Sequence, residues 1–311
     1  MMRDALTRLL GAILAFVGAI TLVFLALRIT PGDPADNILG DEAPEAAKVR
    51  FRERLGLHQP LHVQYGQLWT QIADGTLGES YEVGSGRPVS QIIGEALPPT
   101  IELALAAMLV ACFIAIPFGI LAAVSHGSFI DQFTMFIALL GVAVPVFWSG
   151  PLLLFLFAVQ WQIVPPPGAP LSGPLPLVLP ALVLGIALSA KLSRLVRAAV
   201  LDVLQEDYVL TARAKGLPTR QIMIKHVLRN ALIPVLTVTG LQLAALLSGA
   251  IVTEKVFARP GVGTLLLEAI VQRDYAVIQG CVIVITVAYI VVNVVVDVGY
   301  IVADPRVRRS R

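Results

Sequence analysis

The segment 206–234, EDYVLTARAKGLPTRQIMIKHVLRNALIP, decides the fold because it is polar and basic yet lies between two apolar stretches that are each long enough to cross a bilayer. Basic loops favour the cytoplasmic side of a membrane, which places this segment inside the cell. Its basic residues are Arg213, Lys215, Arg220, Lys225 and Arg229. Small residues gather near its start, at Thr211, Ala212, Ala214 and Gly216. Because small side chains let another protein approach the backbone closely, the segment is predicted to contact a partner.

The composition of the 311-residue chain is typical of a membrane protein. Hydrophobic residues make up 57%, charged residues 14%, and the mean hydropathy is +0.81. An ordinary soluble domain has roughly 25% charged residues. The net charge of +2 is too small to indicate nucleic-acid binding. The two cysteines, Cys112 and Cys281, lie in apolar runs and are interpreted as small buried hydrophobic residues, with no disulfide or metal-binding pattern.

Six apolar runs are close to the length of about 20 residues that crosses a bilayer. They are 9–27, 101–124, 133–159, 177–190, 232–252 and 277–302. The fourth is the shortest and contains Pro180. The first is expected to be an uncleaved span, because its apolar core is too long for a signal peptide and no small-residue cleavage site follows it.

Most lysines and arginines lie at the two ends of the chain and between the fourth and fifth runs, so both termini are expected on the cytoplasmic side. The chain is therefore predicted to be one transmembrane domain, 1–311, with an external segment at 28–100 and a cytoplasmic loop at 191–231. The external segment is expected to form short helices that serve as a lid or docking surface, because its apolar residues are regularly spaced. His58 and His62 have no third ligand beside them, so no metal site is predicted there.

Two further patterns bear on the source of energy. Ion-coupled carriers usually place ionisable groups near the middle of the bilayer. In this sequence Glu102 lies at the start of the second run and Asp297 near the end of the sixth, while the third and fifth runs contain no acidic residue. No phosphate-binding GxxxxGK[ST] sequence occurs either. We therefore expect no catalytic residues in this chain, and an energy source on another chain.

The segment 206–234 resembles the cytoplasmic loop of ATP-binding-cassette importer permeases, in the branch that contains oligopeptide, dipeptide, glutathione and nickel permeases. Other motifs of that branch follow in the same order along the chain. They are ITPGDPA at 29–35, LGLHQPLHVQYGQ at 55–67, LGES at 77–80, LPPTIELAL at 97–105, VPVFWSG at 144–150, SGAIVTEKVFARPGVGTLL at 248–266 and NVVVDVGYIVADPRVR at 293–308. The resemblance covers effectively the whole chain.

This resemblance implies an all-α integral membrane protein of the type I importer permease fold, with six transmembrane helices, in the cytoplasmic membrane of a bacterium or archaeon. It implies a second, related permease subunit, two cytoplasmic ATPase subunits and an external solute-binding protein as partners. ATP and Mg²⁺ belong to the ATPase subunits, and no cofactor is expected in this chain. The solute is expected to be a di- or oligopeptide, with glutathione or nickel as alternatives. An ion-coupled secondary carrier and a membrane scaffold without transport activity are the alternatives from other classes.

The resemblance further implies that a short helix in the cytoplasmic loop docks on the ATPase. The residues implied are Leu210, Thr211, Ala212, Arg213, Ala214, Lys215 and Gly216. Leu210 stands where the wider importer family has a glutamate. Ala212 and Gly216 are four residues apart and would share a helix face, leaving a shallow groove, and Gly216 before Leu217-Pro218 is a typical helix end. The alternative is an amphipathic helix held by lipid headgroups.

The translocation path is less well marked in the sequence. Polar residues of the fifth run are candidates to line it: Thr237, Thr239, Gln242 and Ser248. Close helix packing is the competing interpretation, because small residues in membrane helices most often serve contacts between helices.

Overall fold

A computed structural model describes residues 2–30, 34–40, 42–81, 83, 86–168, 170, 173–248 and 250–303. Over these residues the chain is helical apart from turns and one isolated β-bridge between Glu79 and Pro88. The helices form two compact units. The first comprises Met1–Thr100 and Pro260–Ile290, and the second comprises Ile101–Arg259 and Val291–Arg311.

The first unit is built from the N-terminal third of the chain and from segment 260–290. Its elements are α1 (Met2–Ile29), α2 (Pro34–Leu39), α3 (Glu45–Arg54), α4 (Leu61–Ala73), the start of α5 (Val89–Val124), α13 (Val262–Gln272) and most of α14 (Tyr275–Ala303). Ile20 and Phe24 of α1 pack with Leu68 of α4 and Ile283 of α14. The start of α5 approaches α14 closely, because a Cβ added at Gly280 would lie 2.4 Å from Val89. Segment 28–100 thus forms the short helices that its sequence predicts.

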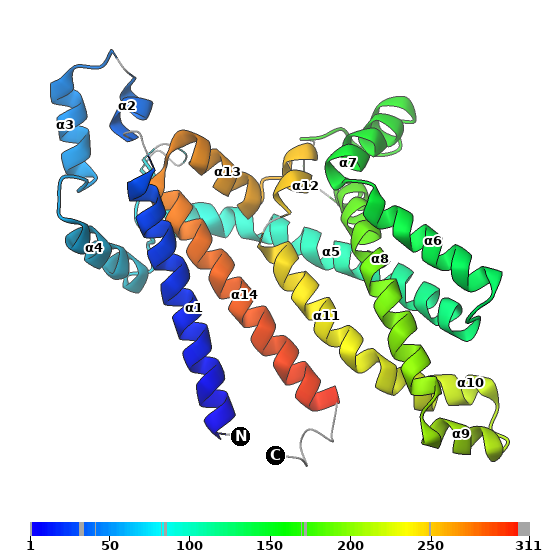
Figure 1. Ribbon diagram of the computed structural model, residues 1–311. Helices are drawn as coiled ribbons and strands as arrows, with labels where there is room; N and C mark the ends of the chain where they lie inside the picture. The colour runs from blue at the N-terminus through cyan, green and yellow to red at the C-terminus, as the bar shows by residue number, and fades with distance from the viewer. Residues whose placement is uncertain are drawn as a thin grey trace. The chain divides into compact units, whose positions relative to one another are not determined.

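The second unit contains the remaining elements and the rest of α5 and α14. They are α6 (Phe129–Ala143), α7 (Val146–Leu154), the π-helix η1 (Phe155–Gln160), α8 (Leu175–Leu204), α9 (Asp207–Ala214), α10 (Thr219–Ile222), the π-helix η2 (Met223–Leu228), α11 (Arg229–Leu247) and α12 (Ile251–Val256). The long helix α8 packs against α6, α7 and α11, and α9 and α10 lie at its C-terminal end (Figure 1).

Five helical stretches of the described residues are long and apolar enough to cross a membrane: Leu10–Ile29, Val89–Val124, Leu175–Leu204, Thr219–Leu247 and Tyr275–Val296. A bent pair, Phe129–Gly141 and Val146–Gln160, makes a sixth if it is one span. The break in this pair bends the path by 87° and falls just before Pro145. A residue that precedes proline is disfavoured in helical conformation, and Val144 accordingly has a ψ of 116°.

The structure corrects several predicted helix bounds. The fourth run is not short: α8 spans 30 residues, because the basic stretch after Ala190 keeps an apolar face that buries Leu192, Val196 and Val200. Helix α5 begins at Val89 rather than at 101, and α11 ends at Leu247 rather than at 252.

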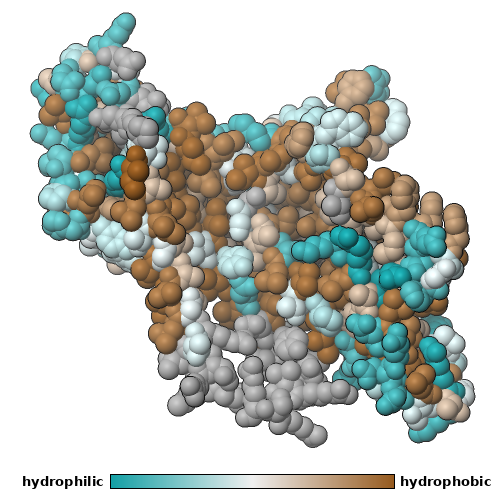
Figure 2. Space-filling model, viewed as in Figure 1, coloured by the Kyte–Doolittle hydropathy of each residue, from teal (hydrophilic) through white to brown (hydrophobic). Residues whose placement is uncertain are grey.

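The long helices expose large apolar side chains, as expected for surfaces that face lipid. Leu14, Leu109 and Phe113 are all strongly exposed. Figure 2 shows hydrophilic side chains gathered over α9 and α10 in the second unit, and over α2 and α3 in the first.

Candidate functional site

The predicted docking helix is α9, which begins after an extended residue, Glu206, with ψ of 140°. Asp207 lies in its first turn and Arg213 in its last. These charges match the helix dipole, which favours acidic groups at the N-terminus and basic groups at the C-terminus. The sequence therefore supports a helix here, although eight residues are too few for an isolated helix to be stable in water. Its stability must come from packing.

The end of α9 is a Schellman motif. Gly216 has φ of +73°, its N–H donates to the Arg213 carbonyl at 2.9 Å, and the Leu217 N–H donates to the Ala212 carbonyl at 3.3 Å. Glycine adopts this left-handed conformation without steric cost. Pro218 follows in extended conformation and precedes α10. The helix end predicted from Gly216 and Leu217-Pro218 is therefore confirmed.

The two faces of α9 differ sharply. Val209 is fully buried and Ala212 is 6% exposed, whereas Leu210 is 50% exposed. Ala212 faces the protein interior, so it does not line a surface groove with Gly216 as the shared helix face predicts. The physical reason is that Val209 and Ala212, three residues apart, form the narrow apolar face that this short helix must bury. The remaining residues of the predicted site are exposed: Thr211, Arg213, Ala214, Lys215 and Gly216.

The buried face of α9 belongs to a core that joins several long helices. Val209 and Ala212 lie in one apolar cluster with residues of α5, α8, α10, η2 and α11: Ala115, Ala123, Leu192, Val196, Ala199, Val200, Ile222, Val227, Ala231 and Val235. Close-packed interiors transmit displacements, because a shift of one element must be followed by its neighbours or leave a cavity. Val209 and Ala212 thus attach α9 to the core that it shares with α8 and α11.

A polar contact adds to this attachment. The Tyr208 hydroxyl accepts a hydrogen bond from Asn230 Nδ2 at 2.8 Å and donates to the His226 carbonyl at 3.4 Å. Asn230 Nδ2 also donates to that carbonyl, at 3.0 Å. We call Tyr208, Asn230 and the His226 carbonyl the α9 clamp, since they tie the start of α9 to η2 and α11. Sequence reasoning missed these residues, because nothing in their local pattern distinguishes them from surface residues.

A second attachment in this unit joins the start of α6 to α8. Arg197 binds the Asp131 carboxylate with two nitrogens, Nε to Oδ1 at 2.6 Å and Nη2 to Oδ2 at 2.7 Å. The Gly127 N–H and His126 Nδ1 also lie within 3.0 and 3.3 Å of Asp131 Oδ2. Bidentate pairing fixes the orientation of both groups. The sequence patterns single out neither residue, because the basic residues between the fourth and fifth runs were interpreted only as a group.

The four candidate path residues all lie on or just after α11, but they differ in their contacts. The hydroxyls of Thr237, Thr239 and Ser248 donate to carbonyls of their own helix, at 3.5, 2.8 and 3.0 Å. Gln242 is 9% exposed, and neither of its amide atoms has a hydrogen-bond partner among the described residues. An unpaired buried amide costs about 1–3 kcal/mol. Among the four candidates, Gln242 is therefore the one whose buried amide is not satisfied by any hydrogen bond within the described part of the chain.

The structure locates one of the two acidic residues considered for ion coupling. Glu102 Oε2 lies 3.4 Å from Nη2 of the buried Arg259, within the second unit. The side chain of Asp297 lies outside the described residues. No group of three or more His, Cys, Asp and Glu residues within the described ranges is arranged to hold a metal ion.

Comparison with protein families gives two matches that together cover nearly the whole chain. The model for the inner membrane component of binding-protein-dependent transport systems matches residues 115–309. The model for the N-terminal part of such membrane components matches residues 1–104.

Among curated proteins, the chain is 41% identical over 308 residues to the glutathione transport system permease protein GsiC of Salmonella typhimurium, with 99% of both chains covered. It is 39% identical over 338 residues to the di/tripeptide transport system permease protein DppB of Pseudomonas aeruginosa, with 100% of both covered. A putative peptide transport system permease protein of Brucella abortus is 40% identical over 309 residues, with 97% of this chain and 98% of the relative covered.

Two solved structures share the fold at 15% sequence identity. The MetNI methionine ABC transporter in an inward-facing conformation gives a TM-score of 0.53 over 70% of this chain and 98% of that chain. An amino acid ABC transporter crystallised with histidines gives 0.51 over 70% of this chain and 94% of that chain.

Proposed function

The chain belongs to the family of binding-protein-dependent transport system inner membrane components, and we propose that it is the permease subunit of an ATP-driven importer of short peptides. The observation that carries the mechanism is the two-faced helix α9, whose buried Val209 joins the core of the long helices while Leu210 is exposed. The relatives named for peptide, di/tripeptide and glutathione transport support the substrate class. Glutathione is itself a modified tripeptide, so the substrates in these names all belong to one chemical class, short peptides.

In this proposal the chain neither forms nor breaks a covalent bond. It pairs with a related permease subunit, binds two cytoplasmic ATPase subunits and receives its solute from an external binding protein. ATP and Mg²⁺ act on the ATPase subunits. When these subunits close on ATP, they draw together the α9 helices of the two permeases. The core around Val209 and the α9 clamp pass this movement to α8 and α11, which changes an inward-open passage into an outward-open one.

The proposed orientation places both termini and α9 in the cytoplasm. Single cysteines introduced into the assembled complex test it with a membrane-impermeant thiol reagent. Cysteines at Gln71, Pro167 and Gln272 should react from outside, and those at Arg213 and Arg308 only from inside. Arg308 lies outside the described residues. External reaction at Arg213 with protection at Pro167 would reverse the orientation and remove the ATPase contact.

The experiment that tests the function is uptake by proteoliposomes that contain both permeases, both ATPases and the binding protein. ATP should drive accumulation of a di- or tripeptide, and this chain alone should hydrolyse no ATP. Uptake of glutathione or Ni²⁺ in place of simple peptides would assign the alternative solutes. Uptake driven by a proton gradient without ATP would contradict the importer and support an ion-coupled carrier.

A further inference from the structure

The first unit contains a cavity of about 520 Å³ that the transport mechanism above does not use. Its walls come from the C-terminal end of α1, from α3 and α4, from residues of 76–81 with Gly86 and Pro88, and from the N-terminal end of α14. Pockets of roughly 300–1,000 Å³ are of the size that takes small ligands. In the proposed orientation, this cavity lies at the outer ends of α1 and α14.

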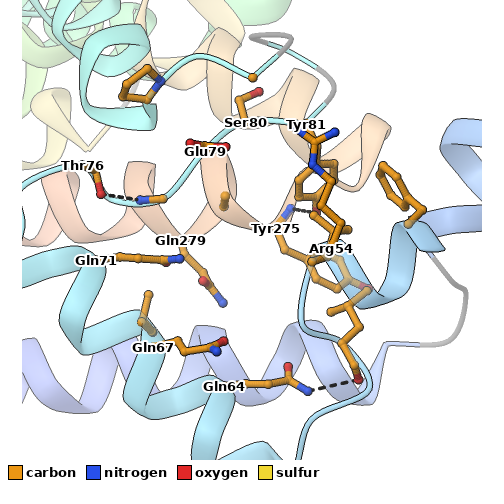
Figure 3. A pocket seen from close by; sticks show the side chains of 18 of the residues that line it. Arg54, Gln64, Gln67, Gln71, Thr76, Glu79, Ser80, Tyr81, Tyr275 and Gln279 are labelled. Carbon is orange, nitrogen blue, oxygen red and sulfur yellow. Dashed lines mark hydrogen bonds between the residues drawn. The ribbon is translucent and has the colours of Figure 1, made fainter. Parts of the chain in front are cut away.

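Four glutamine side chains belong to the polar lining. Gln64, Gln67 and Gln71 come from one side of α4, and Gln279 comes from α14. Figure 3 shows Gln67, Gln71 and Gln279 directed toward a common space. A glutamine amide donates and accepts, as a peptide group does. Such side chains suit a ligand that carries amide groups.

Gln279 brings to the lining of the cavity a buried polar group that has no hydrogen-bond partner in the described part of the chain. Its side chain is 8% exposed, and its Nε2 has no hydrogen-bond partner among the described residues. Buried donors are nearly always paired, because an unpaired one loses its bond to water without replacement. Gln64 differs in this respect, since its Oε1 accepts from Arg28 Nε and Nη2 at 3.2 Å each and its Nε2 donates to the Gln59 carbonyl at 2.8 Å.

The wall opposite α4 is held firmly in place. Ser80 Oγ donates to Asp274 Oδ2 at 2.7 Å, and the Tyr81 hydroxyl donates to the Arg273 carbonyl at 2.8 Å. Burial raises the pKa of Tyr81 well above its usual value, so the hydroxyl stays protonated and keeps this bond at any physiological pH. A cavity with fixed walls costs little further ordering when a ligand enters, which favours binding.

Charged groups of both signs border the cavity. Arg54 and Glu79 both line it and are both exposed (Figure 3). A free peptide carries a carboxylate at one end, an ammonium group at the other and amides between them. We propose that this cavity is an accessory binding site for a short zwitterionic peptide, in which Gln279, Gln71 and Gln67 bind its amide groups while Arg54 and Glu79 attract its charged ends. The choice of a peptide rests on the proposed function.

The test measures occupancy at the cavity itself, in the complete transporter reconstituted in nanodiscs. Gln67→Cys places an exposed thiol in the lining, and its rate of reaction with an impermeant maleimide is followed as trialanine is added. Trialanine should slow the reaction, and N-acetyl-trialanine amide, which lacks both end charges, should do so only at higher concentration. Adding Gln279→Leu should raise the half-protecting concentration of trialanine about three- to tenfold, the effect of one lost hydrogen bond.

Gln91→Leu is the matched control, because Gln91 is exposed on α5 in the same unit and does not line the cavity. It should leave protection unchanged. If Gln279→Leu lowers the melting temperature, Gln71→Leu replaces it with the same expected shift. Equal protection in the Gln279→Leu, Gln71→Leu and control proteins would overturn the proposal, as would protection by the binding protein but not by trialanine. If ATP-driven peptide uptake persists in either case, only the accessory site fails, whereas loss of peptide uptake in the unmodified transporter would refute the proposed function.

Discussion

Leu210 and Val209 are neighbours on α9, and replacing each with alanine should affect different properties. Leu210→Ala should weaken binding of the ATPase subunit, whereas Val209→Ala should lower the stability of the permease. Leu210 is 50% exposed, so half of its surface remains to be buried by a partner. Full burial of a leucine side chain contributes about 1.5–3 kcal/mol, and the remaining half about 0.8–1.5 kcal/mol. Because 1.4 kcal/mol is a tenfold change in affinity, Leu210→Ala should weaken binding of the ATPase subunit about four- to twelvefold.

Val209 is fully buried and belongs to the core shared with α8 and α11. Val209→Ala removes two carbon atoms, each worth about 0.8 kcal/mol of transfer free energy, and leaves a small cavity. The free energy of unfolding should fall by about 2 kcal/mol, with little change in the exposed face. Leu210→Ala, by contrast, should change the stability of the permease by less than about 0.5 kcal/mol.

The assay measures two quantities on the same purified permease pair. Fluorescence anisotropy of a labelled ATPase subunit gives the affinity, and thermal denaturation in detergent gives the stability. The expected pattern is weaker ATPase binding with normal melting for Leu210→Ala, and early melting with nearly normal binding for Val209→Ala. ATPase affinity within twofold of the unmodified protein for Leu210→Ala would refute the docking role of this face. Weaker attachment of the same variant to anionic lipid vesicles would then favour the membrane-surface helix.

Three further predictions concern single contacts. Gly216→Trp should leave the complex assembled but abolish substrate-stimulated ATP hydrolysis and uptake. Gly216→Asn should retain most of both activities, because asparagine tolerates the left-handed backbone. Normal uptake by the tryptophan variant would exclude Gly216 from the contact with the ATPase subunit. Tyr208→Phe should lower the free energy of unfolding by about 1 kcal/mol, because it removes the hydrogen bond to Asn230. It should also raise the number of ATP molecules hydrolysed per peptide imported. An unchanged number of ATP molecules per peptide would show that the α9 clamp does not transmit movement. A hydrogen bond from Lys48 at 2.8 Å lowers the pKa of Asp36. This pair therefore stabilises the fold above the unfolded-state pKa of about 3.9 and loses its effect as pH falls through the lower folded value. The protection of amides in α2 and α3, measured against the intrinsic exchange rate at each pH, should fall in acid, and Asp36→Asn should remove that part of the pH dependence.

The sequence predicted the membrane spans well where the apolar run coincides with the helix, as in α1 and α14. It underestimated α8 because Lys191, Arg194 and Arg197 end the apolar run but not the helix, whose buried stripe continues past them. The bend before Pro145 follows from a local rule, yet its angle depends on what packs around it.

The exposed and buried faces of α9 were only partly predictable. The helix end at Gly216 follows from glycine and proline chemistry. The burial of Ala212 depends on which face of α9 meets α8, which small-residue spacing alone does not specify. The pairing of Asp131 with Arg197 joins residues 66 positions apart, and single-sequence patterns carry no signal over that distance. Gln64, Gln67 and Gln71 do recur at helical spacing, but Gln279 joins them only through the fold.

The central claim is that the outer face of α9 contacts an ATPase subunit during transport. Site-specific photo-crosslinking tests it most directly, with a benzoylphenylalanine placed at Leu210 or Ala214, both exposed, and at Glu95, which is exposed on α5 in the first unit, as the control. In the assembled, actively importing complex, the two α9 positions should crosslink to an ATPase subunit and the control should not. Crosslinks from Leu210 and Ala214 to lipid alone, in a complex that still imports peptide, would contradict the account.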